Sequence, residues 1–113
     1  MTKYAIFFTY SSDSWARMIG VPGDRTAAVR QVLSSMGGSL ECIYWMHDGF
    51  SDGLVIADLP DAVSAAAASI AVTSTGAITR SEAHELLSQE QLGQALRQAG
   101  ATVRAFQPPG RET

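Results

Sequence analysis

Residues 4–10 are apolar on both faces when they are drawn as a β-strand. Successive side chains of a strand point to opposite faces, which gives two sets here: Tyr4, Ile6, Phe8 and Tyr10, against Ala5, Phe7 and Thr9. A strand that is apolar on both faces is typical of a sheet that is covered on both sides. The segment is therefore expected to be a central strand.

A β-hairpin is expected in the middle of the chain. Residues 39–47 and 54–59 are rich in β-branched, aromatic and other apolar residues, and the segment between them contains Asp-Gly twice. Asp-Gly is a strong signal for a tight turn between antiparallel strands. A regular first strand of this hairpin places four side chains on one face, namely Leu40, Cys42, Tyr44 and Met46.

Helices are expected around these strands. One begins near Ser12, pauses at residues 20–23 and continues over residues 24–36, and an alanine-rich helix covers residues 62–73. Residues 77–86 alternate as a fourth strand. Ser88 and Gln91 form a capping box for a last helix that Gly100 ends. Residues 102–106 are expected to add a short fifth strand or an edge.

The order β-α-β-β-α-β followed by a helix predicts an α+β fold of ferredoxin-like topology, with an antiparallel sheet and helices on one face. The other face carries exposed apolar side chains, which is unusual for a soluble monomer. We therefore expect a homodimer or higher homo-oligomer that pairs its sheets. Residues 1–106 are expected to form one domain, and residues 107–113 a flexible C-terminal tail.

Composition and charge argue against nucleic-acid-binding, membrane-bound and secreted classes of protein. The chain has 113 residues, of which 46% are hydrophobic and 17% charged, as in an ordinary globular domain. The net charge is −3 and the cations are scattered, so neither nucleic acid nor a membrane surface is an expected partner. Cys42 is the only cysteine, and the start of the chain lacks the pattern of a secretory signal. A cytoplasmic location is expected.

Two groups of residues could carry acid–base chemistry. His47 lies beside Asp48 and near Asp52, and a histidine with a neighbouring carboxylate can act as a general base. Arg80, Glu82 and His84 share one face of a regular strand, where they could bind an anion and move a proton. Turn capping is the competing interpretation for the first group. A solvated strand face or an ion pair at an oligomer interface is the competing interpretation for the second.

Ligand binding has its own candidates. Tyr10, Trp15 and Trp45 could line an aromatic pocket, with Asp52 and Glu82 as its polar groups. Ordinary packing is the competing interpretation for each aromatic residue. No metal site is expected, because the sequence lacks paired cysteines and the common histidine spacings, and no cofactor is expected.

Several stretches across residues 3–99 resemble the GYD-domain family. They include Tyr10-Ser11-Ser12 with Trp15 soon after, and the double glycine before the second strand. The best match is residues 49–61, with a glycine, an aromatic residue, an aspartate, a β-rich strand and then Pro-Asp. Residues 75–80 and 87–90 are also similar. Ser51 stands where the family has a tyrosine, although Phe50 is adjacent.

The resemblance implies membership of the dimeric α+β-barrel superfamily, which includes cofactor-free monooxygenases, isomerases, decarboxylases, haem-handling enzymes and ligand-sensing modules. A shared fold does not fix the function among these. Three hypotheses follow. The first is a small-molecule-binding homo-oligomer whose pocket lies between sheet and helices or inside the dimer barrel; the others are a cofactor-free isomerase or monooxygenase with a histidine base, and a protein-interaction module. If the family tyrosine is catalytic, Ser51 marks its loss; if it packs the hairpin, Phe50 can replace it.

Overall fold

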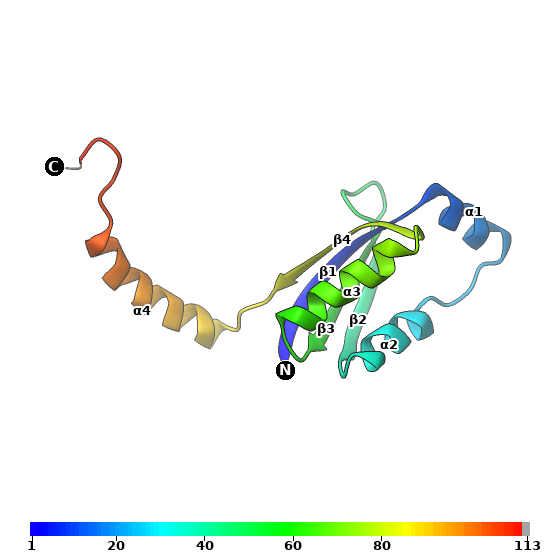
Figure 1. The fold of residues 1–113 in the computed structure, drawn as a ribbon, viewed down its shortest axis with the longest axis horizontal. Coiled ribbons are helices and arrows are strands. Elements are labelled where there is room, and N and C mark those ends of the chain that lie inside the picture. The colour runs from blue at the N-terminus through cyan, green and yellow to red at the C-terminus, as the bar shows by residue number, and fades with distance from the viewer. Residues whose placement is uncertain (112–113) are drawn as a thin grey trace.

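A computed structural model describes residues 1–111 of the chain. The elements follow in the order β1 (Thr2–Tyr10), α1 (Ser12–Gly20), α2 (Thr26–Ser35), β2 (Ser39–Trp45), β3 (Gly53–Leu59), α3 (Ala62–Ser74), β4 (Ile78–Glu85) and α4 (Gln89–Ala105). The predicted pause between the first two helical segments is present, and residues 21–25 join them (Figure 1). The expected tail begins after α4, and its residues 112–113 lie outside the described residues.

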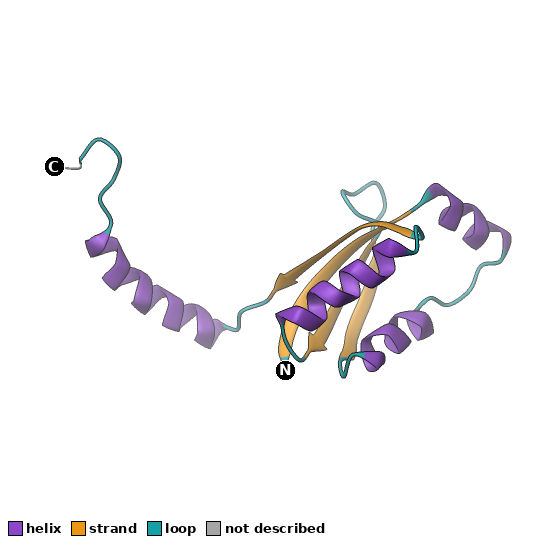
Figure 2. Cartoon of the chain, viewed as in Figure 1, coloured by secondary structure: helices purple, strands orange, loops and turns teal. Residues whose placement is uncertain are grey.

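The four strands form one antiparallel sheet in the order β2-β3-β1-β4. β1 is central, as its two apolar faces predict, and its Ile6 lies between Val55 of β3 and Ala83 of β4. α2 and α3 pack on one face of this sheet (Figure 2). The ferredoxin-like α+β fold is therefore confirmed.

The core lies between the sheet and these two helices. Leu59 and Ala57 of β3 are fully buried, and Leu33 of α2 and Ala65 of α3 pack against the same cluster. Gly53 is required by close packing, because a Cβ there would lie 2.3 Å from the ring of Phe8. The short alanine side chains of α3 let that helix lie near the sheet.

The opposite face of the sheet, here called the open face, has an apolar centre. Its central side chains come from three strands and include Phe7, Tyr44, Leu54 and Ile56. The ring of Phe50 lies 5.1 Å from that of Phe7, and Phe50 and Tyr44 are both well exposed. At one end Lys3 forms ion pairs with Glu41 at 2.8 Å and Asp58 at 3.4 Å.

The expected side-chain alternation of β2 is wrong at its start. The register with β3 shifts between Leu40, which pairs with Ala57, and Cys42, which pairs with Ile56. A β-bulge inserts one unpaired residue and so reverses the order of faces that follows. As a result Leu40 packs against the core, whereas Cys42 lies on the open face.

The expected strand at residues 102–106 and the expected end of the last helix at Gly100 are also wrong. α4 continues to Ala105, and its capping box of Ser88 and Gln91 is formed as predicted. A glycine inside a helix costs about 1 kcal/mol relative to alanine, which does not stop a helix whose apolar spacing continues to Val103. α4 extends away from the sheet, with none of its residues buried (Figure 1).

Candidate functional site

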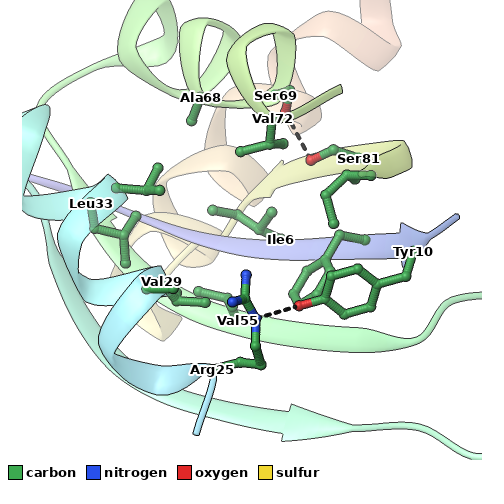
Figure 3. A pocket seen from close by; sticks show the side chains of 14 residues that line it. Ile6, Tyr10, Arg25, Val29, Leu33, Val55, Ala68, Ser69, Val72 and Ser81 are labelled. Carbon is green, nitrogen blue, oxygen red and sulfur yellow. Dashed lines mark hydrogen bonds between the residues drawn. The ribbon is translucent and has the colours of Figure 1, made fainter. Parts of the chain in front are cut away.

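A cavity of about 140 Å³ lies between the sheet, α2 and α3. Its walls are aliphatic and aromatic side chains from β1, β3 and both helices, among them Ile6, Phe8, Val29, Val55, Ala68 and Val72 (Figure 3). A cavity of roughly 150 Å³ with such walls accommodates a benzene-sized molecule. The space is therefore large enough for one small ring.

Polar groups occur at two places in this cavity. At the rim, Arg25 Nε donates a hydrogen bond of 3.4 Å to the hydroxyl oxygen of Tyr10 (Figure 3). On the α3 and β4 side, the hydroxyls of Ser69 and Ser81 lie 3.1 Å apart and share one hydrogen bond. Arg25 is the one charged residue among those that line the cavity.

Four of the predicted ligand-binding residues are brought together beside the rim. The ring of Tyr10 stacks on Trp45 at 6.0 Å and meets Trp15 edge-on at 5.5 Å. Asp52 Oδ2 accepts hydrogen bonds from the backbone N–H of Tyr10 at 2.8 Å and from Trp15 Nε1 at 3.3 Å. Of these four residues, Tyr10 alone lines the cavity, and the other three hold it in place.

The trio of Arg80, Glu82 and His84 lies on the open face, away from the cavity. The carboxylate of Glu82 accepts a hydrogen bond from Arg80 Nη2 and lies 3.4 Å from His84 Nε2. The hydrogen bond from Arg80, followed by that from His84, lowers the pKa of Glu82. The predicted strand-face grouping is therefore present, with its carboxylate between two cations when His84 is protonated.

Arg80→Gln is expected to raise the pKa of Glu82 toward its ordinary value, because the largest cause of the lowering is removed. In the wild type the lowered pKa stabilises the fold above the unfolded-state pKa, and that contribution is lost as pH falls through the folded-state pKa. Carboxyl ¹³C NMR titration of both proteins measures the change. Arg104→Gln, on α4, is the control and should leave the titration unchanged; an equal midpoint in Arg80→Gln would contradict the contact.

His47 is separate from both groups. It lies in the exposed turn after β2, where its Nδ1 is 3.2 Å from a carboxylate oxygen of Asp48 and 94% of its side chain is exposed. Asp48 has a φ of 58°, as expected for an Asp-Gly turn. Within residues 1–111, no three His, Cys, Asp or Glu side chains are grouped so as to hold a metal ion.

Ser51 has a definite place in this structure. It is buried, and its hydroxyl donates a hydrogen bond of 2.9 Å to the backbone oxygen of Phe8. The backbone N–H of Asp52 donates a second bond to the same oxygen, at 2.9 Å. Ser51 thus helps to attach the hairpin to the end of β1, and Phe50 packs on the open face instead.

Sequence reasoning missed the residues that line the cavity from the helices. Arg25 stands between two helical segments, where no periodic pattern marks it, and Ser69 is a single hydroxyl within an alanine-rich helix. The available signal was an arginine immediately before a helix whose apolar face is small. That signal alone does not indicate a cavity.

Comparisons with known proteins identify one family. The family model described as GYD domain matches residues 4–96 of the chain, from β1 into the first half of α4. No curated protein and no solved structure matches the chain. Across the part of the chain that the structure describes, none of the helices is both long and apolar enough to cross a membrane.

Proposed function

This chain belongs to the GYD domain family, and we propose that it is a homo-oligomeric domain that binds one small molecule in the cavity beneath α2 and α3. The observation that carries the proposal is the cavity itself, with apolar walls and a few polar groups. Concave, mostly apolar sites with a small number of placed polar groups are the general form of small-molecule sites.

The homo-oligomer is proposed from the open face. Phe7, Leu54 and Ile56 lie at its centre, with the exposed ring of Phe50 beside them. Pairing this face with the same face of a second copy removes a contiguous apolar surface from water. A two-fold pairing of this kind needs no surface other than the open face itself.

The trio on the open face supports a second candidate function, proton transfer. His84 as a base, oriented by Glu82, with Arg80 beside the developing negative charge, is the arrangement that a cofactor-free isomerase or monooxygenase would use. In a paired sheet these residues would border the interface. We prefer the cavity because it is concave and surrounds a ligand on several sides, whereas the trio lies on an open surface.

Toluene is the probe that tests the cavity. Toluene added to ¹⁵N-labelled protein is expected to shift the amide signals of residues around the cavity, such as Val29, Val72 and Ile78. Ala68→Leu fills the space and should abolish those shifts, because Ala68 lines the cavity. Ala67→Leu, at the exposed neighbouring position, is the matched control and should retain them.

Two results would contradict ligand binding in this cavity. One is the absence of any shift at toluene saturation in the wild type. The other is a set of shifts that persists unchanged in Ala68→Leu, since toluene would then be bound elsewhere.

A further inference from the structure

We propose that the ligand of this cavity is a small apolar carboxylate, with its hydrocarbon part among the aliphatic walls and its carboxylate on Arg25 and Tyr10 at the rim. The inference rests on the proposed function and names the chemistry of its ligand. It is carried by the contrast between an apolar cavity and the single cation at its edge.

The guanidinium of Arg25 has N–H donors that remain available for a ligand. Its Nε is engaged by Tyr10, and within residues 1–111 its guanidinium forms no ion pair with a carboxylate. A guanidinium carries five N–H donors in a planar fork, which matches the two oxygens of a carboxylate. The four remaining N–H groups are thus available for an acidic ligand at the rim.

Tyr10 supplies a second donor in a fixed position. Its hydroxyl oxygen accepts the hydrogen bond from Arg25, so the phenolic O–H can be donated to a ligand. Tyr10 is only 7% exposed, its ring packs against Trp15 and Trp45, and its backbone N–H donates a hydrogen bond to Asp52. A donor held this firmly loses little conformational entropy on binding.

Apart from Arg25 and Tyr10, most of the cavity lining favours hydrocarbon. Ser69 and Ser81 share one hydrogen bond, and the rest of the lining is apolar, including Val72 and Leu33. At about 140 Å³ the space holds one ring or a branched chain of similar size. A ligand with an apolar body and a single acidic group therefore matches both the apolar lining and the Arg25–Tyr10 pair at the rim.

The start of α2 argues for a singly charged carboxylate rather than a phosphate dianion. Asp24 Oδ1 already accepts the backbone N–H of Thr26 at 2.8 Å, so a carboxylate of the chain occupies this helix start. That hydrogen bond lowers the pKa of Asp24. Arg25 is the one charged residue that lines the cavity, so a second negative charge on the ligand would have no cation to pair with there.

Isothermal titration with benzoate and benzamide tests the inference, because the two molecules have nearly the same shape and differ in charge. At pH 7 benzoate should bind at least about tenfold more tightly than benzamide to the wild type, since hydrogen bonds to charged groups are the stronger ones. Arg25→Gln should remove that preference, and Arg25→Lys should restore part of it. Arg30→Gln, an exposed arginine on the same helix, is the matched control and should keep it.

The outcomes separate the two proposals. If toluene and benzamide bind but benzoate gains nothing, the carboxylate is wrong and the cavity stands. If phenyl phosphate binds more tightly than benzoate, the singly charged ligand is wrong. If no probe binds, both proposals fail. An amide NMR spectrum of each Arg25 variant confirms that a lost preference does not come from unfolding.

Discussion

Leu59→Ala should lower the free energy of unfolding by about 3 kcal/mol, the middle of the range for deleting a fully buried leucine side chain. Leu59 is 0% exposed and is the largest fully buried side chain among residues 1–111. It lies at the end of β3, where β1, β3 and the start of α3 meet around the core. The substitution removes apolar contacts and leaves a void that this junction cannot close completely.

Urea unfolding followed by tryptophan fluorescence measures the change, with all proteins at one concentration because association adds to stability. Leu87→Ala is the matched control, since the same atoms are removed from a side chain that is 58% exposed. It should change the free energy of unfolding by less than about 0.5 kcal/mol. Equal effects of the two substitutions would show that Leu59 is not in the core.

Ile56→Lys should convert the proposed homo-oligomer into folded monomers. Ile56 lies on the open face, paired with Ala5 and Cys42 of the neighbouring strands. Burying an unpaired ammonium in a sheet-to-sheet interface costs several kcal/mol, so the dissociation constant should rise by about 100-fold or more. In the monomer the same ammonium reaches water, and the fold is retained.

Sedimentation velocity over a range of concentrations measures the assembly, and circular dichroism confirms the fold. Val63→Lys is the charge-matched control, because Val63 is a well exposed residue of α3 on the other side of the molecule. It should leave the assembly intact. A wild type that is monomeric at every concentration, or an Ile56→Lys variant that still associates, would overturn the pairing of open faces.

Much of the fold could be predicted because its signals are local. The two apolar faces of residues 4–10 and the capping box of Ser88 and Gln91 each specify an element by themselves. The two Asp-Gly pairs predict the hairpin but not its loop, because residues 46–52 form a longer connection than a tight turn and Gly53 already belongs to β3. The bulge at the start of β2 could not be predicted in this way. It is a property of how β2 pairs with β3, and no residue at that position requires it.

The candidate site likewise has a part that could be predicted from the sequence and a part that could not. Tyr10, Trp15, Trp45 and Asp52 could be chosen by residue type, but their grouping depends on the hairpin meeting the end of β1. The doubly apolar sheet allowed a pocket between sheet and helices, but its lining could not be predicted, because the cavity is the space that remains when two helices rest on a sheet. Arg25 lines the cavity only because the folded chain brings the start of α2 next to Tyr10 of β1.

Because α4 is detached, we expect its local opening to cost much less free energy than the unfolding of the sheet. Compact proteins of about 100 residues have a radius of gyration near 13 Å, whereas that of this chain is 18.5 Å. Since α4 buries no residue, it lacks the tertiary packing that supplies most helical stability, and Gly93 and Gly100 weaken it further. Amide hydrogens of residues 89–105 should therefore exchange through local fraying, while those of β1 exchange only when the whole sheet opens.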